Sequence, residues 1–303
     1  MKRFLILLAV LILLAGGLSA HAAHSRRARP APPPPPPPYR AAIVADAETG
    51  KVLFQENADA PVPPASLTKV LSLYLTFDAV RRGKVRWRDP VRISRKAWRT
   101  GGSRMFVNVG TDVSLGDLVL GMAVVSANDA TVAVAERLGG TESGFVAAMN
   151  AEAQALGMSR SRFANAHGLP AKGQVTTARD MLRLTRAYLT RFPAALTVHA
   201  RRNFTYNKIS QHNRNRLLGR YPGADGVKTG YIFASGYHLI ATARRGRTRL
   251  IAVVLGARTP GVRTREAVRL LDDGFSMMGV APPTVPVRPA GVRPPAVGGS
   301  ART

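Results

Sequence analysis

Cysteine is absent from the 303 residues of this chain, so disulfide bonds and thiolate metal sites are excluded. Acidic residues are scarce: 17 Asp and Glu stand against 44 Lys and Arg, which gives a formal net charge of +27. This excess predicts attraction to polyanions, which include nucleic acid, anionic lipid and acidic cell-envelope polymers. The six histidines follow neither the His-x-x-x-His nor the His-Glu-x-x-His pattern. The sequence therefore predicts no zinc site and no metal cofactor.

The N-terminus favours one of these polyanions over the others. Lys2 and Arg3 precede the apolar run Phe4–Leu14, which is followed by the small-residue stretch Ser19–Ala22. The run is short for a membrane anchor, and its order of residues is typical of a secretory signal cleaved after about Ala22. We therefore expect an exported protein that works in the periplasm or another extracytoplasmic space. Nucleic acid is then not an expected partner, whereas electrostatic contact with the anionic envelope is.

Proline-rich segments flank the part of the chain that is expected to fold. Residues 23–38, which follow the signal segment 1–22, end in an uninterrupted proline run and are predicted to form a stiff linker. Residues 281–303 contain six Pro, three Gly and three Arg, and are predicted to be disordered. Residues 39–280 remain as the folded domain, and the apolar content of 46% is enough for its core.

Within that domain, strands are expected at both ends and helices in the middle. A short apolar run at Ala41–Ala47, the turn residues 48–51 and a second short segment at Val52–Gln55 predict a hairpin. Further strands are expected at Val227–Phe233, Tyr237–Ala243 and Leu250–Leu255. Helical periodicity predicts helices from Ser66 to Gly83 and at Leu115–Val125, Asp129–Leu138, Phe145–Leu156, Ala178–Phe192 and Thr264–Met278. This order predicts an α+β domain in which helices flank an antiparallel sheet that the N-terminal hairpin returns to join.

Ser66 and Lys69 form a Ser-x-x-Lys pair at the start of the first predicted helix. Residues three apart share a helix face, so the hydroxyl and the amine can meet. Burial, the helix N-terminus and a second nearby cation all lower a lysine pKa, and a neutral Lys69 can then deprotonate Ser66. Alone, however, the pair is weak evidence, because its usual interpretation is a capping serine and a solvated lysine.

Two more motifs lie where such a serine enzyme needs them. Ser126-Ala127-Asn128 falls between two predicted helices, and Lys228-Thr229-Gly230 opens a predicted strand. Each motif by itself has an ordinary interpretation: Asn128 or Asp129 caps the next helix, and Lys228 is a solvated lysine on an edge strand. A phosphate-binding loop is excluded, because Val227 stands where Gly-Lys-Thr needs glycine. The ordered set of three motifs is typical of penicillin-binding proteins and class A β-lactamases.

From about Tyr39 to Gly279 the sequence resembles the low-molecular-mass penicillin-binding proteins of the D-alanyl-D-alanine carboxypeptidase family. The resemblance implies a β-lactamase/transpeptidase-like fold with a helical subdomain and no cofactor. It also implies removal of the terminal D-Ala from peptidoglycan stem peptides through a Ser66 acyl-enzyme, which β-lactams would acylate as covalent inhibitors. The segments that carry it are 63–69, 126–130, 165–169, 225–230 and 265–267.

The same resemblance implies a role for each site residue. Ser66 is the acylated nucleophile, Lys69 is its base, and Ser126 relays a proton. The backbone N–H groups of Ser66 and Tyr231 form the oxyanion hole. Fixed cations are needed for a free C-terminal carboxylate. The residues expected to bind substrate are Asn128, Lys228, Thr229, Gly230, Tyr231 and Arg265.

Two departures from the family pattern stand out. Ala127 occupies a position where glycine is usual, so the local backbone geometry is a point to test. Many relatives also carry a second β-rich domain and an amphipathic anchor, for which residues 281–303 are too short and too rich in proline. We therefore expect no stable membrane anchor.

Three alternative functions remain open at this point. Short relatives include D-alanyl-meso-diaminopimelate endopeptidases, so cleavage of cross-links is the nearest alternative. A β-lactamase is disfavoured, because the resemblance implies slow deacylation and the sequence identifies no base for that step. The third alternative is a polycationic wall-binding protein that keeps the fold without catalysis.

Overall fold

The computed structural model describes residues 37–282. The predicted signal peptide at 1–22 lies outside the described residues, as do nearly all of the predicted linker at 23–38 and of the predicted tail at 281–303. Within residues 37–282, none of the helices combines the length and the apolar character needed to cross a membrane.

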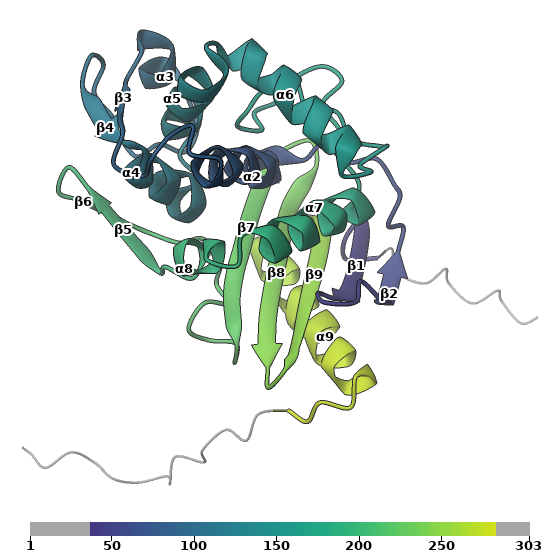
Figure 1. Cartoon of the computed structure of the whole chain (residues 1–303). Coiled ribbons are helices and arrows are strands. Elements are labelled where there is room, and N and C mark those ends of the chain that lie inside the picture. The colour runs from purple at the N-terminus through teal and green to yellow at the C-terminus, as the bar shows by residue number, and fades with distance from the viewer. Residues whose placement is uncertain (1–36, 283–303) are drawn as a thin grey trace, which may run out of the picture. The chain divides into compact units, whose positions relative to one another are not determined.

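A five-stranded antiparallel sheet with the order β2-β1-β9-β8-β7 lies at the centre of the fold (Figure 1). The N-terminal hairpin joins this sheet through β1, which pairs with β9 along its whole length. Both the predicted antiparallel sheet and the predicted return of the hairpin are confirmed. The strands are β1 (Ala41–Asp46), β2 (Val52–Glu56), β7 (Ala224–Ile232), β8 (Gly236–Arg245) and β9 (Thr248–Ala257).

Helices cover both faces of this sheet. On β1, Ile43 packs into the core of one face while Val44 packs into the core of the other. Figure 1 shows helix α7 (Ala178–Arg191) in front of the sheet and helix α9 (Pro260–Met277) behind it. Burial on both faces explains why β1 is a continuous apolar run rather than an alternating one.

The remaining helices form a subdomain above the front face of the sheet (Figure 1). Its central helix α2 (Thr68–Arg81) has ten buried residues out of 14 and packs against three other helices of the domain, α5, α6 and α7. The helices around it are α3 (Arg95–Arg99), α4 (Leu115–Leu120), α5 (Asn128–Gly139) and α6 (Glu142–Ala155). Because α2 is buried on almost all sides, the side chains of its first turn are fixed by packing against the core.

Several local features differ from the prediction. Ser66 lies in a short 3₁₀ turn, η1 (Ala65–Leu67), and α2 begins only at Thr68, so Ser66 does not cap the helix. The helix expected at 115–125 is divided into α4 and a π-helical turn, η2 (Gly121–Val125). Short elements that the periodicity did not resolve are β3 (Pro90–Arg92), β4 (Asp112–Ser114), α8 (Ala195–His199), β5 (Asn203–Tyr206) and β6 (Ile209–His212).

Candidate active site

Ser66 and Lys69 meet at the junction of η1 and α2. The Lys69 amine is fully buried, and its Nζ lies 3.3 Å from Ser66 Oγ. Nζ also donates hydrogen bonds of 2.6 Å to Asn128 Oδ1 and 2.6 Å to the His167 backbone carbonyl. A neutral amine has two N–H groups and one lone pair. Because the two carbonyl oxygens only accept, they take the two N–H groups and leave the lone pair for the Ser66 hydroxyl.

Electrostatics favour this neutral form. Burial is the main cause that holds the pKa of Lys69 well below its usual value, and the positive charges of Lys228 and Arg214 lower it further. The Asp129 carboxylate acts in the opposite direction but more weakly. Asp129 is also occupied, because it accepts hydrogen bonds from the backbone N–H groups of residues 105–107.

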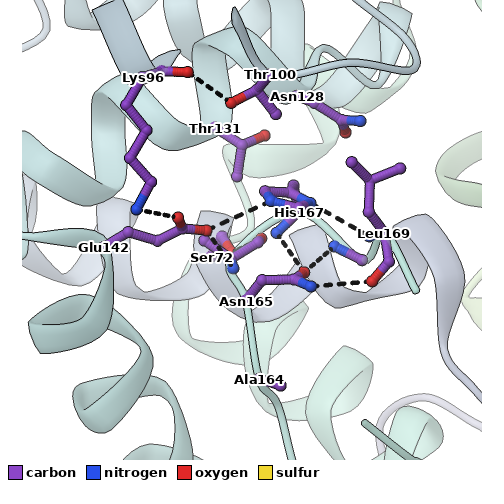
Figure 2. Close-up of polar contacts among 12 residues, drawn as sticks. Ser72, Lys96, Thr100, Asn128, Thr131, Glu142, Ala164, Asn165, His167 and Leu169 are labelled. Carbon is purple, nitrogen blue, oxygen red and sulfur yellow. Dashed lines mark hydrogen bonds and ion pairs between the residues drawn. The ribbon is translucent and has the colours of Figure 1, made fainter. Parts of the chain in front are cut away.

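The His167 carbonyl is held in place by a chain of contacts that ends at the surface (Figure 2). Glu142 Oε1 accepts a hydrogen bond of 3.2 Å from the backbone N–H of Ala166 and lies 3.4 Å from His167 Nε2. Glu142 Oε2 forms an ion pair of 2.7 Å with the partly exposed Lys96. Burial is the main cause that lowers the pKa of His167 to about 4, so the ring is neutral near pH 7. Its Nδ1 accepts from the backbone N–H of Leu169, which places the proton on Nε2, facing Glu142.

Gly168 explains why the loop 165–169 can approach Ser66 so closely. Its φ of +90° favours glycine, and a Cβ atom at this position would lie 1.8 Å from the Ala65 carbonyl oxygen. Asn165 closes the turn, since its Oδ1 accepts from the backbone N–H of Gly168 at 2.7 Å. The sequence marked this loop as part of the family pattern but assigned no role to it. In the structure it supplies one of the two acceptors of Lys69.

The second motif follows η2 and faces Ser66 from the helical side. Ser126 adopts a left-handed backbone with φ of 66°, and its buried Oγ has no hydrogen-bond partner among residues 37–282. Ala127 has φ of −60° and ψ of 118°, an extended conformation open to any residue. The position therefore does not require glycine, and alanine fits it without backbone strain. Asn128 donates through Nδ2 to the Gly101 carbonyl at 2.7 Å, which orients its Oδ1 toward Lys69.

The third motif lies on β7, at the edge of the sheet. Lys228 is buried, and within residues 37–282 its Nζ makes one hydrogen bond, of 3.1 Å, to the Thr229 carbonyl. Burial is the main cause that lowers the pKa of Lys228 to about 7, and Arg214 and Arg263 contribute through charge repulsion. Gly230 lies against the nucleophile turn, since a Cβ atom there would be 3.3 Å from the backbone nitrogen of Ser66.

The structure corrects the assignment of Arg265. This side chain is exposed, does not line the cleft, and lies back along α9 with its guanidinium near Gly261. The arginine in the cleft is Arg263, which is only 5% exposed and whose Nε has no hydrogen-bond partner in the described part of the chain. Two residues along an α-helix differ by about 200° in direction, so both side chains cannot face the same cleft. Burial lowers the pKa of Arg263 to about 10, and Arg216 adds to the shift.

Most of these residues line a single cleft of about 660 Å³. Lys69, His167 and Lys228 are buried and contact or adjoin its lining residues without lining it themselves. We call its two sides the helical wall and the sheet wall. The helical wall comprises Ser66, Lys69, Ser126, Asn128 and His167. The sheet wall comprises residues 228–231 on β7 together with Arg214, Arg216 and Arg263. Except for Arg265, every residue predicted from the three motifs belongs to one of these walls. Arg214 and Arg216 lie on a loop for which the sequence gave no periodic signal.

Known proteins match both the sequence and the fold. The profile of the D-alanyl-D-alanine carboxypeptidase family, peptidase S11, covers residues 33–259. The D-alanyl-D-alanine carboxypeptidase DacC of Escherichia coli is 41% identical over 254 residues, which are 82% of this chain and 64% of DacC. The structure of penicillin binding protein 5 from Haemophilus influenzae has 38% identity and a TM-score of 0.77, and the match covers 80% of this chain and 72% of that one.

The match extends to a relative solved with a bound drug. Penicillin-Binding Protein D2 from Listeria monocytogenes, in its ampicillin-bound form, is 32% identical with a TM-score of 0.73, over 80% of this chain and 100% of that one. The fold is thus that of the penicillin-binding proteins. The chain belongs to the D-alanyl-D-alanine carboxypeptidase family, peptidase S11. It spans 64% of the length of the DacC relative and 64% of the DacF relative from Bacillus subtilis.

Proposed function

We propose that this protein is a serine-type D-Ala-D-Ala carboxypeptidase that removes the terminal D-Ala from peptidoglycan stem peptides. The observation that carries the proposal is the environment of Lys69. Its buried amine is held by two carbonyl oxygens, with Ser66 Oγ 3.3 Å away. This arrangement supports a base that is already neutral and already aimed at its nucleophile before substrate arrives.

Acylation follows from this geometry. Ser66 Oγ attacks the carbonyl carbon of the penultimate D-Ala while its proton passes to Lys69 Nζ. The backbone N–H groups of Ser66 and Tyr231 stabilise the oxyanion of the tetrahedral intermediate. Ser126 Oγ, which lines the same cleft, relays a proton to the leaving nitrogen as the C–N bond breaks. Terminal D-Ala departs as an amine, and water with Lys69 as base then hydrolyses the Ser66 ester.

The sheet wall supports recognition of a free C-terminal carboxylate. Lys228 and Arg263 are buried cations, and neither forms an ion pair with an acidic side chain within residues 37–282. Buried charges without a counter-charge are costly, and a substrate carboxylate would supply one to both. Thr229 lines the same cleft, where its hydroxyl can donate to the same carboxylate.

Covalent binding of β-lactams is part of the same proposal. A β-lactam presents a cyclic amide next to a carboxylate, so it would use Ser66 and the sheet-wall cations as a peptide does. Support comes from the Listeria relative that was solved in its ampicillin-bound form. We also propose export of the chain by its N-terminal segment, because its substrate class lies outside the cytoplasm. Its net positive charge would then concentrate it near the anionic envelope.

The test is mass spectrometry of the purified protein with a synthetic pentapeptide that ends in D-Ala-D-Ala. We expect the wild type to release one alanine and the Ser66→Ala variant to release none. Equal release by both would contradict the role of Ser66. Failure on the pentapeptide together with cleavage of a cross-linked peptide dimer would replace the carboxypeptidase with an endopeptidase. Failure on both substrates, with binding to cell walls retained, would favour the non-catalytic wall binder.

A further inference from the structure

A buried histidine that the proposed mechanism does not use lies next to the oxyanion hole. Under the proposed function, the two oxyanion donors are the backbone N–H groups of Ser66 and Tyr231, which belong to separate segments, η1 and β7. Packing between these segments must therefore fix the spacing of the two donors. His238 is on β8, the neighbour of β7 in the sheet (Figure 1), and it pairs directly with Gly230, the residue before Tyr231.

The His238 ring and the nucleophile turn meet at Gly230. A Cβ atom on Gly230 would lie 3.3 Å from His238 Cδ2, and also 3.3 Å from Ala65 Cβ and from the Ser66 backbone nitrogen. Directly paired residues of an antiparallel sheet present their side chains on the same face. The imidazole therefore lies on the face of β7 that Gly230 leaves bare, beside the turn that carries Ser66.

Two hydrogen bonds fix the orientation of this ring. His238 Nδ1 accepts from the backbone N–H of Gly256 on β9 at 2.9 Å, which places the ring proton on Nε2. Nε2 lies 2.8 Å from the buried Oγ of Ser235, in the turn between β7 and β8. The pairing of β8 with β9 shifts register between Tyr237 and Leu239, and such a bulge re-aims side chains. One ring thus joins β9, the β7–β8 turn and the end of β7.

The ring is uncharged and out of reach of a substrate. Burial is the main cause that lowers the pKa of His238 to about 3, against the opposing effect of a hydrogen bond to the Pro63 backbone. His238 is completely buried and does not line the cleft. Its contribution is therefore geometric, because a neutral ring behind the strand neither binds the substrate nor exchanges a proton with it.

We propose that His238 is a positioning residue that sets the spacing of the two oxyanion donors by holding the end of β7 against the turn with Ser66. This proposal rests on the proposed function and adds a residue to it. The oxyanion must accept from both donors at once, so a small shift of Tyr231 weakens binding of the tetrahedral intermediate. Binding of the unreacted peptide by the sheet-wall cations is unaffected, so the loss falls on kcat rather than on KM.

The test compares a mimic of the tetrahedral intermediate with a ground-state ligand. The mimic is a peptide boronic acid: Ser66 Oγ bonds to boron, its proton passes to Lys69, and the tetrahedral boronate anion occupies the oxyanion hole. The ground-state ligand is the pentapeptide, bound to the Ser66→Ala protein. His238→Phe keeps a ring but loses both hydrogen bonds, so we expect boronate affinity and kcat to fall about tenfold. This is a fraction of the 10²–10³-fold loss of a whole donor. Pentapeptide affinity and KM should change less than about twofold.

Graded variants and a matched control assign the effect. His238→Asn keeps an acceptor at the position of Nδ1 and should lose less boronate affinity than His238→Phe. Ser235→Ala removes only the bond at Nε2, should lose about threefold, and tests the proposal even where the ring substitution does not fold. His199→Phe is the control, since His199 is also buried and bonded to β7, but at the Val227 carbonyl. It should lower the thermal transition while boronate affinity stays within about twofold.

The outcomes separate this proposal from the proposed function. Wild-type boronate affinity in folded His238→Phe and in Ser235→Ala would overturn the role of His238, as would an equal loss in His199→Phe. An equal loss of boronate and pentapeptide affinity would also overturn it, because it would show general damage to the cleft. Release of alanine by the wild-type protein tests the proposed function independently of all these variants.

Discussion

The two buried lysines on opposite walls of the cleft differ in how many hydrogen bonds their amines make. Lys69, on the helical wall, has two carbonyl acceptors at 2.6 Å and the Ser66 hydroxyl at 3.3 Å. Lys228, on the sheet wall, has one hydrogen bond among residues 37–282, to the carbonyl of its own neighbour. Burial depresses the pKa of both amines. The hydrogen-bond partners of Lys69 are therefore in place before substrate binds, whereas Lys228 has no counter-charge among the described residues.

Under the proposed function, this difference separates chemistry from recognition. The helical wall is fixed by the protein, through Asn128, the 165–169 loop and the Glu142 carboxylate behind it. The sheet wall gathers cations that the described protein leaves without acidic partners. Buried polar groups are normally paired, so unpaired cations at a cleft indicate a missing anionic ligand. Substitutions on the two walls should accordingly affect different kinetic constants.

The largest effect is expected from Lys69→Met. The substitution keeps a long apolar side chain but removes the base, so acylation of Ser66 should slow by about 10³-fold, within the range of general-base catalysis. The measurement is the rate of covalent labelling by a fluorescent penicillin. Labelling within tenfold of the wild-type rate would show that another group accepts the Ser66 proton. Lys69→Met should retain a folded thermal transition.

Lys228→Met should instead weaken recognition of the carboxylate. A lost charged hydrogen bond of about 1.5–3 kcal/mol raises KM by roughly tenfold to a hundredfold. The effect should be confined to peptides with a free C-terminal carboxylate and be small for the C-terminal amide. An equal loss on both peptides would show that Lys228 serves the chemistry, and the contrast between the two walls would fail.

The pH dependence sharpens the same contrast. The pKa of Lys228 is about 7, so the ammonium form prevails below pH 7 and is lost as the pH rises through that value. Affinity of Ser66→Ala for the free-acid peptide should therefore fall above pH 7, by up to about tenfold per pH unit. The amide peptide should show no such decline. A flat profile for the acid peptide would exclude Lys228 as its counter-charge.

Arg263 and Arg265 give a matched pair on one helix. Arg263→Gln should raise KM about tenfold, because it removes a buried cation from the cleft. Arg265→Gln should leave KM and kcat unchanged, since that side chain is exposed and does not line the cleft. Steady-state kinetics on the pentapeptide compare the two variants directly. The reverse outcome would restore the assignment made from the sequence.

The smallest effect is expected from Glu142→Gln. It removes the charge that pairs with Lys96 and faces His167, and should lower the free energy of unfolding by about 1–2 kcal/mol. Because the loop positions Lys69, kcat should fall about threefold to tenfold while KM stays constant. Lys96→Met, at the exposed end of the chain of contacts, is the control and should lower the free energy of unfolding and kcat by less than Glu142→Gln does. A change in KM alone would show that Glu142 does not act by positioning Lys69.

The features predicted correctly from the sequence are those that lie within single short segments of the chain. Each of the three motifs is a short run of residues, and the hairpin and C-terminal strands follow from patterning within single segments. The sheet could also be inferred, because helices between two groups of antiparallel strands leave few arrangements. The contacts of Lys69 with Asn128 and the His167 carbonyl join residues 59 and 98 positions apart, which no local pattern reveals.

Two errors have local physical causes. The expected start of the last helix at Thr264 is four residues late, because the Thr259 cap and Pro260 were missed. Arg265 was taken from the family resemblance, which does not show that Arg263, rather than Arg265, lines the cleft. The loop with Arg214 and Arg216 follows the short hairpin β5–β6, whose strands are only four residues each and largely exposed, so that their pattern is too short to stand out. A search for cations without neighbouring acids in residues 201–223 would have drawn attention to it.

The most direct test of the whole account is to identify the residue that a β-lactam modifies. The protein is incubated with a penicillin, digested and mapped by mass spectrometry, with Ser66→Ala in parallel. The account predicts one adduct on the wild type, located on Ser66, and none on the variant. An adduct on another residue, or undiminished modification of Ser66→Ala, would contradict it.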